Sequence, residues 1–161
     1  MLSRAVSRFA TISTRQYAAA AAKASGAEEL LFTLASPDQA IYTNAVVKQV
    51  DVPTLAGVVG VLASHVPTIG VLKPGVVQVT GTDGAVSKYF VSSGTLAMNI
   101  DGSCQVLAEQ LAKLEDIDES AARAELESAQ RASGEGSDVA KAEAQIRAEV
   151  AEALLKAVSG H

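Results

Sequence analysis

The sequence predicts a β-sandwich or barrel that is followed by a pair of α-helices. From residue 28 to about residue 111, short runs of Val, Leu, Ile and Thr alternate with turn residues, a pattern typical of sandwiches and barrels. Residues 115–161 instead hold eleven acidic and five basic residues, many alanines and no proline, which favours helices. Hydrophobic residues make up 48% of the 161-residue chain, enough for a core, and with no Trp, three Phe and three Tyr that core must be largely aliphatic.

The first strand is predicted over Leu30–Ala35, where β-forming residues alternate with a period of two. An SPD turn at residues 36–38 ends this strand. A short strand at Ile41-Tyr42 and a longer one at residues 45–52 follow. We expect Pro53 to close the longer strand, because proline cannot donate a hydrogen bond to a neighbouring strand.

Six glycines and prolines interrupt the apolar stretch at residues 57–79, GVVGVLASHVPTIGVLKPGVVQV. Glycine loosens the backbone and proline blocks the helical hydrogen bonds, so this stretch predicts several short strands joined by tight turns. The SHVP turn at residues 64–67 lies between apolar strands. We therefore expect it to project from the edge of the sandwich.

Glycine turns separate the remaining predicted strands. The TDG turn at residues 82–84 predicts a hairpin that continues into a strand at Val86–Val91. Turns at residues 93–94 and 101–102 bracket two more strands, and in the last of them Cys104 is expected to face the core. The total is eight to ten short strands.

Two helices are predicted after the last strand. Asp116 with Glu119 forms a plausible capping box at the start of the first helix, which is expected to end near Ala132. The SGEGS segment at residues 133–137 is a connecting turn, and the second helix is predicted over Asp138–Val158.

The predicted helices carry few large apolar residues. Leu126 is the only one in the first helix. The second helix has an apolar stripe that consists of Val139, Ala142, Ile146, Val150, Ala153, Leu154, Ala157 and Val158. Alanine faces allow close contact but bury little area, so we expect the hairpin to dock on the β-domain or on a partner.

The first 27 residues carry four basic residues and no acidic residue. On a helix, Leu2, Val6, Phe9 and Ile12 would lie on one side, with arginines on the other. This amphipathic, acid-free pattern is typical of a mitochondrial transit peptide, and the alternative is a disordered basic tail.

The position of an arginine three residues before the cut predicts cleavage of the transit peptide between Tyr17 and Ala18. A small-residue linker would follow it. The expected division of the chain is therefore a transit peptide at residues 1–17, a linker at 18–27, a β-sandwich at 28–112 and a helical hairpin at 113–161.

The rest of the chain is acidic, with nine basic and eighteen acidic residues. Such a surface is poorly suited to nucleic acid, whose recognition requires basic side chains. No apolar run approaches the roughly 18 residues that a membrane span needs, so a role at a membrane would be peripheral. Cys104 is the only cysteine, which excludes an intrachain disulfide and fits a reducing compartment.

No catalytic or cofactor-binding pattern stands out. Ser64, His65 and an aspartate could be combined into a triad on paper, but the nucleophile-elbow pattern is absent. There are only two histidines, one of them the terminal residue, which argues against a histidine metal site. The glycines form neither a P-loop nor a dinucleotide fingerprint, so we expect no enzymatic activity and no cofactor.

His65 has two interpretations. It is either a turn histidine whose ring is satisfied by local hydrogen bonds, or an interface residue on an exposed loop tip beside Pro67. Loops that project from a rigid scaffold often carry binding residues.

Four motifs together resemble one protein family. The stretch at residues 57–79 is similar to the signature G-x-x-G-(V/I)-L-P-x-H-x-P followed by LKPG-V, and FVSSG at 90–94 resembles F-x-V-S-G-G. VLAE at 106–109 resembles the strand V-x-V-L-A-(D/E), and EDID at 115–118 resembles the start of a helical hairpin. Over residues 28–158 the chain resembles the small rotor subunit of F-type ATP synthases, called epsilon in bacteria and chloroplasts and delta in mitochondria. The predicted transit peptide points to the mitochondrial members.

The resemblance implies a ten-stranded β-sandwich followed by an antiparallel two-helix hairpin, without an active site. It also implies a peripheral position on the matrix side of the mitochondrial inner membrane. One side of the subunit would pack on the gamma subunit, the lower end would meet the c-ring, and a small mitochondrial epsilon subunit would bind as well. The subunit would couple proton-driven rotation of the ring to the catalytic head.

The same resemblance assigns an interface role to Val58, Ser64, His65 and Pro67. Ala63 stands where the signature commonly has proline.

One departure concerns nucleotide binding. Several bacterial relatives bind ATP through I/L-D-x-x-R-A at the first helix, whereas here four residues separate Asp118 from Arg123. Moving the arginine by two positions rotates it by about 200° around a helix, so we expect this chain to bind no nucleotide.

The main alternative is a free-standing β-sandwich that binds a small ligand beneath a helical lid. That function would need aromatic or polar clusters around a cavity, and three tyrosines spread along the chain do not suggest one. A regulator whose helices extend to block rotation, as in bacterial relatives, is disfavoured by the altered ATP motif.

Overall fold

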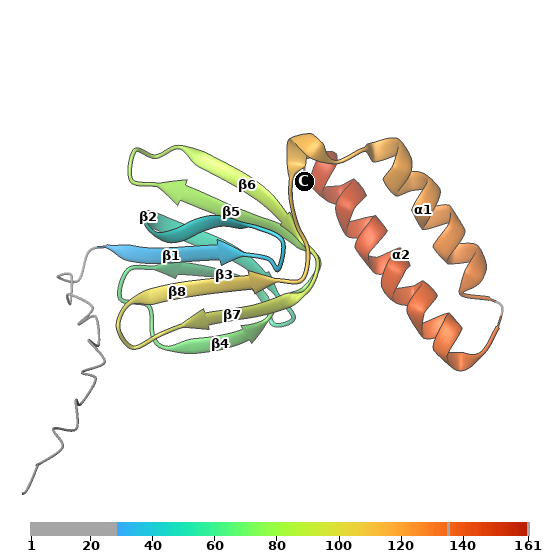
Figure 1. Ribbon diagram of the computed structural model, residues 1–161, viewed down its shortest axis with the longest axis horizontal. Helices are drawn as coiled ribbons and strands as arrows, with labels where there is room; N and C mark the ends of the chain where they lie inside the picture. Colours follow the sequence, from blue (N-terminus) through green and yellow to red (C-terminus); the bar gives the residue numbers. More distant parts are fainter. Residues whose placement is uncertain (1–28, 135, 161) are drawn as a thin grey trace, which may run out of the picture.

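The computed structural model describes residues 29–134 and 136–160. A β-sandwich occupies one end of the molecule and a helical hairpin the other (Figure 1). The predicted transit peptide, the cleavage site between Tyr17 and Ala18 and the linker lie outside the described residues.

Nine strands form the sandwich within the described part of the chain. Their bounds are β1 Leu30–Ala35, β2 Ala40–Thr54, β3 Gly57–Leu62, β4 Thr68–Val71, β5 Gly75–Gly81, β6 Val86–Val91, β7 Gly94–Met98, β8 Ser103–Ala108 and β9 Leu111–Lys113. The strands follow the order β4-β7-β8-β1-β2-β5-β6-β9, and β3 pairs with β2. Only the β1–β8 pair among these is parallel.

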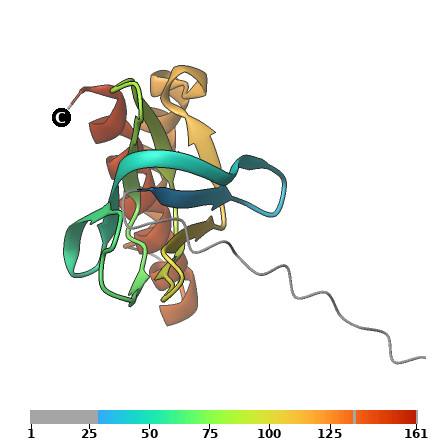
Figure 2. The same cartoon turned by 90° about the vertical axis from the view of Figure 1, so that its left-hand side faces the viewer.

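The long strand β2 connects the two layers of the sandwich. Its first half pairs with β1, and its second half pairs with β3 and β5. Since β1 and β3 use the same edge of β2 in succession, the strand must bend as it passes from one layer to the other. Figure 2 looks onto the end of the sandwich that faces away from the hairpin, where β2 is seen crossing the molecule.

The predicted sandwich with a C-terminal two-helix hairpin is confirmed, although the described residues form nine strands and not the ten that the resemblance implied. The two strands predicted at Ile41-Tyr42 and at residues 45–52 are one strand, β2, which continues through the left-handed Asn44 (φ 50°). Pro53 was wrongly expected to end this strand. It lies inside β2 opposite Val58, and its carbonyl accepts a hydrogen bond from the Lys73 amide at 3.1 Å.

The core of the sandwich is aliphatic, as composition predicts. Its largest fully buried side chains include Phe32, Leu30, Leu34 and Leu96, and Cys104 is buried among them. Burial raises the pKa of the Cys104 thiol to about 11, so the thiol is protonated at neutral pH.

A short 3₁₀ turn, η1 (Leu114–Asp116), leads from β9 into the helices α1 (Glu119–Ala132) and α2 (Asp138–Val158). The predicted capping box of Asp116 with Glu119 is wrong. The N-cap of α1 is Asp118, because Asp116 is taken up by the 3₁₀ turn and the chain is extended at the two residues that follow it.

Only alanines are buried in the two helices. The buried residues of the hairpin are Ala122, Ala129, Ala144, Ala151 and Ala157. Three members of the predicted apolar stripe, Val139, Ala142 and Ile146, are instead exposed. No described helix is both long enough and apolar enough to cross a membrane.

Candidate interface and the start of the helical hairpin

The SHVP loop is held in one shape by hydrogen bonds to its own backbone. Ser64 adopts a left-handed conformation (φ 64°), and the His65 amide donates to the Leu62 carbonyl at 3.1 Å. The Val66 carbonyl oxygen lies 2.9 Å from His65 Nδ1 and accepts from Thr68 Oγ1 at 2.8 Å. Because a carbonyl only accepts, Nδ1 carries a proton in this contact.

This geometry agrees with both interpretations of His65. One ring nitrogen is satisfied locally, while the side chain stays partly exposed at the loop tip. The Nδ1 partner is a backbone carbonyl, whereas a catalytic triad requires a carboxylate at that position.

The structure separates the four residues that the resemblance assigned to an interface. Ser64, His65 and Pro67 lie together in the loop between β3 and β4. Val58 lies at the opposite end of β3 and lines a cleft between the sandwich and α2, together with Pro53 and residues of α2.

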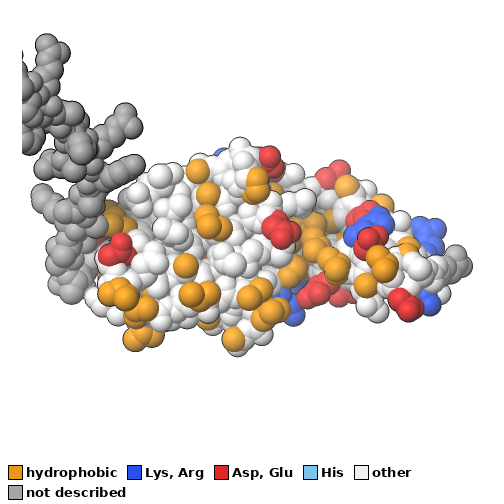
Figure 3. Space-filling view, turned by 60° about the horizontal axis from the view of Figure 1, so that its bottom comes forward, with side chains coloured by type: hydrophobic (Ala, Val, Ile, Leu, Met, Phe, Trp, Pro, Cys, Tyr) orange, Lys and Arg blue, Asp and Glu red, His pale blue; other side chains and the backbone are white. Residues whose placement is uncertain are grey.

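Sequence analysis missed a set of exposed apolar side chains in the segment that contains this loop. No Asp, Glu, Lys or Arg occurs from residue 52 to residue 72. Within this segment six large hydrophobic residues are between 49% and 86% exposed: Leu55, Val58, Leu62, Val66, Ile69 and Val71. In Figure 3 the sandwich is mostly uncharged, with orange side chains along its lower edge, while red and blue side chains gather on the hairpin.

The sequence does contain a pattern that could have predicted these exposed apolar side chains. A run of 21 residues without a formal charge is unusual for the surface of a chain in which 19% of residues are charged. Exposed apolar patches on a rigid surface commonly mark sites of protein contact.

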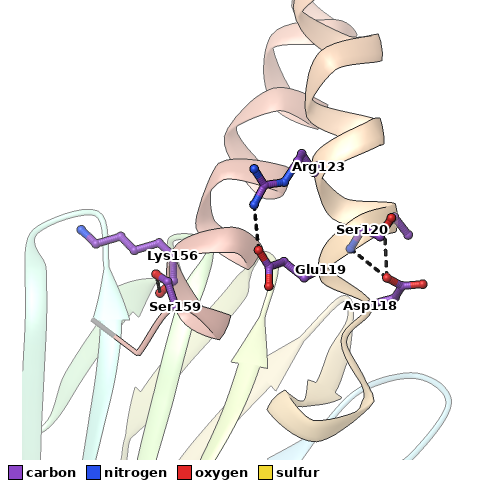
Figure 4. Close-up of polar contacts among 7 residues, drawn as sticks. Asp118, Glu119, Ser120, Arg123, Lys156 and Ser159 are labelled. Carbon is purple, nitrogen blue, oxygen red and sulfur yellow. Dashed lines mark hydrogen bonds and ion pairs between the residues drawn. The ribbon is translucent and has the colours of Figure 1, made fainter.

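The candidate nucleotide motif is engaged in structural contacts. Asp118 Oδ1 accepts from the amides of Ser120 at 2.8 Å and Ala121 at 3.1 Å, and so caps α1. Arg123 forms an ion pair with Glu119 at 2.8 Å, one helical turn away (Figure 4). Asp118 and Arg123 therefore have different partners and do not form one site.

Titratable groups in the described part of the chain do not gather into a cluster of three or more that could hold a metal ion. The Asp101 carboxylate, in the turn between β7 and β8, accepts from the hydroxyl and the amide of Ser103. These two hydrogen bonds hold the pKa of Asp101 below its usual value.

Comparison with known proteins identifies the family to which this fold belongs. The family model described as "ATP synthase, Delta/Epsilon chain, beta-sandwich domain" matches residues 29–113, which is the whole β-sandwich. The chain belongs to the delta/epsilon family of ATP synthase subunits. The family predicted from the motifs is therefore confirmed.

Members of this family resemble the chain along most of its length. "ATP synthase subunit delta, mitochondrial" of Caenorhabditis elegans is 71% identical over 160 residues, which cover 99% of this chain and 98% of the relative. The protein of the same name from Yarrowia lipolytica is 39% identical, over 83% of this chain and 82% of its own.

Solved structures include similar chains. One, from the Euglena gracilis mitochondrial ATP synthase (OSCP, F1 and c-ring), has a TM-score of 0.75 and 28% identity, covering 81% of each chain. Another, from the central stalk and c-ring of Tetrahymena thermophila mitochondrial ATP synthase, has a TM-score of 0.59 and covers 82% of this chain and 96% of its own. At 17% identity, this second likeness supports the fold alone.

Proposed function

We propose that this delta/epsilon-family protein joins the gamma subunit to the c-ring in the central stalk of the mitochondrial ATP synthase. It is a rotor subunit and has no catalytic role of its own. Its task is to transmit rotation of the proton-driven ring toward the catalytic head.

One observation carries the proposal: the uncharged segment at residues 52–72 exposes six large hydrophobic side chains. Covering such a surface releases water and favours association, so the segment suits a lasting contact inside a complex. The SHVP loop forms the tip of this surface at the end of the sandwich away from the hairpin (Figure 1).

The sandwich supplies the stiffness that a rotor needs. Its core consists of fully buried Leu, Val and Phe side chains in two hydrogen-bonded layers. Close-packed interiors have low compressibility and transmit strain, so torque applied at one end reaches the other.

Our proposal gives the SHVP loop and the side of the sandwich different partners. Ser64, His65 and Pro67 contact the c-ring, while the side of the sandwich packs on gamma. Val58, beside the cleft that α2 borders, would contribute on the gamma side. A small mitochondrial epsilon subunit would bind to the same stalk.

We also propose that residues 1–17 direct import and are removed before Ala18, leaving the mature protein on the matrix side of the inner membrane. Sequencing the N-terminus of the mature protein tests this step. An intact Met1 in the assembled complex would contradict it.

The decisive experiment replaces His65 with glutamate in cells where the variant is the only source of the subunit. We expect at least about fivefold less c-ring retained with the solubilised complex on native gels, because a carboxylate would be buried in an apolar contact. Ser128→Glu, which puts the same charge on an exposed position of α1, is the matched control.

Normal ring retention by the His65→Glu variant would overturn the loop assignment. Migration of the unaltered protein as a free monomer, away from any large ATPase complex, would overturn the stalk function itself. Circular dichroism of the purified variant establishes that the fold is intact.

Nucleotide binding has a separate test. Because Asp118 caps α1 and Arg123 pairs with Glu119, we expect isothermal titration of the purified protein with ATP to give no binding. Micromolar affinity would contradict this expectation.

A further inference from the structure

Two tyrosines from different layers of the sandwich lie against each other. Tyr42 is in the first half of β2, which pairs with β1, whereas Tyr89 is on β6, between β5 and β9. Their phenol oxygens are 3.2 Å apart, a hydrogen-bond distance, although the two residues are 47 positions apart in the sequence. Strands β2 and β6 are not neighbours in the strand order, so the link between them here is made by side chains.

The two rings are held at close range in one orientation. Their centroids are 5.8 Å apart and their planes are inclined at 86°, an edge-to-face arrangement. Two phenols placed end to end with this oxygen distance would have their centroids much farther apart. The rings therefore overlap at their hydroxyl ends, which brings the carbons beside the two hydroxyls close together. Tyr42 also packs on the fully buried ring of Phe32, at 5.6 Å between centroids.

The composition of the chain directs one-electron oxidation to this pair. The chain has no Trp, its only cysteine, Cys104, is fully buried, and Met98 is 3% exposed. Both tyrosines pack against the core but stay partly exposed. In the part of the chain that the structure describes, they are thus the readily oxidised side chains that solvent can reach. The third tyrosine, Tyr17, lies outside the described residues.

We propose that Tyr42 and Tyr89 form a site of oxidative cross-linking, where a one-electron oxidant joins their rings as dityrosine. Each phenol gives up one electron and one proton, and the two phenoxyl radicals form a carbon–carbon bond between the carbons beside their hydroxyls. Each of these carbons then releases its hydrogen as a proton while the oxygen regains one, which restores both hydroxyls. The pair loses two hydrogen atoms in total, and one hydrogen peroxide, acting through a haem peroxidase, takes them up as two waters.

The new bond would join the two layers of the sandwich covalently. It closes a long loop, 47 positions from Tyr42 to Tyr89, in a chain whose single cysteine allows no intrachain disulfide. Linking residues so far apart removes conformational freedom from the unfolded chain and so stabilises the folded one. Because the rings already touch, the bond forms with little rearrangement of the strands.

The first test oxidises the purified full chain, at low protein concentration, with a haem peroxidase and hydrogen peroxide. The tryptic peptides that carry the pair are 24–48 and 89–113. Mass spectrometry of the monomer should find them joined with the loss of two hydrogens, together with dityrosine fluorescence. Since proximity makes the coupling intramolecular, we expect about tenfold more of this product than of any product that contains Tyr17. Unfolding the chain in urea before oxidation should remove this preference.

Three conservative variants assign the bond to its residues. Tyr42→Phe and Tyr89→Phe should each abolish the joined peptides, because phenylalanine forms no phenoxyl radical. Both variants keep the ring and remove only the hydroxyl, so the packing of the sandwich is retained. Tyr17→Phe is the matched control and should leave the yield of joined peptides unchanged.

The second test measures what the bond does to the sandwich. The cross-linked monomer should unfold with a Tm about 10 °C above that of the untreated chain, as expected for a long closed loop. Oxidised Tyr42→Phe should instead keep the Tm of its untreated form.

Several outcomes would overturn the proposal. These are bonds only between separate molecules, bonds mainly to Tyr17, an equal yield of the joined peptides in urea, and persistence of the product in either Phe variant at position 42 or 89. An unchanged or lowered Tm of the cross-linked monomer would show that the bond does not stabilise the two layers. Both tests use the isolated chain, so their outcomes are independent of the proposed stalk function.

Discussion

The sandwich and the hairpin differ in what they bury. The sandwich core holds Phe32, leucines and valines with no exposed surface, whereas all the buried residues of α1 and α2 are alanines. Buried apolar area sets most of the hydrophobic stabilisation, so the sandwich gains far more per residue than the hairpin. The comparison teaches that the sandwich and the hairpin should differ in stability, with the hairpin the less stable of the two.

The largest expected effect on stability comes from truncating a large side chain in the sandwich core. Phe32→Ala should lower the free energy of unfolding by about 4 kcal/mol, since the ring is fully buried and leaves a cavity. Urea denaturation of the purified protein measures the change. Gln105→Ala, on the exposed side of β8, should cost less than about 0.5 kcal/mol, and a similar loss for both variants would refute the contrast.

Replacing a buried alanine of the hairpin with a larger residue should disturb the hairpin and leave the sandwich intact. Ala151 is 1% exposed and lies one turn after Arg147, which pairs with Glu125 of α1, so Ala151→Leu should cost about 2 kcal/mol by overpacking the hairpin. Hydrogen exchange measured by mass spectrometry should show faster exchange in residues 119–158 only. Ala142→Leu, at an exposed position of α2, is the control, and faster exchange throughout β1–β9 would mean that the two regions unfold together.

Removing the N-cap of α1 should have a smaller effect on stability. Asp118→Ala removes the acceptor of two amides and should cost about 1 kcal/mol, seen as faster exchange in the first turn of α1. Asp116→Ala should change little, because Asp116 lies in the preceding 3₁₀ turn. A larger loss of stability for the substitution at position 116 than for the one at 118 would instead support the capping box that the sequence predicted.

Local pattern was enough to predict much of this fold. Alternation predicts β1, a TDG turn predicts the β5–β6 hairpin, and apolar spacing after the SGEGS turn predicts the bounds of α2, which run from Asp138 to Val158 as expected. The family motifs predicted the sandwich-and-hairpin arrangement and the family itself.

Other features depend on long-range geometry. Asn44 looks like a break in the strand pattern, yet its left-handed conformation only bends β2. Val58 and His65 lie seven positions apart in one motif, but strand β3 carries them to opposite ends of the sandwich. Ile69 and Ile100 come together only because β4 pairs with β7, a register that no local pattern encodes.

The smallest expected effect concerns the ion pair that links the two regions. Lys73 Nζ, between β4 and β5, lies 3.9 Å from Glu149 Oε1 on α2, and both side chains are more than half exposed. Such a pair contributes at most about 0.5 kcal/mol and is screened by salt. A double-mutant cycle with Lys73→Ala and Glu149→Ala, read by urea denaturation, should therefore give a coupling energy within that limit that vanishes in 1 M salt. A coupling of about 2 kcal/mol that persists in salt would mean that this ion pair holds the hairpin firmly to the sandwich, and the expected contrast in stability between the two regions would be weakened. With the weak coupling, the alanine-lined helices stay attached mainly through their packing against the sandwich, so a partner that covers the cleft beside Val58 could decide where the hairpin rests.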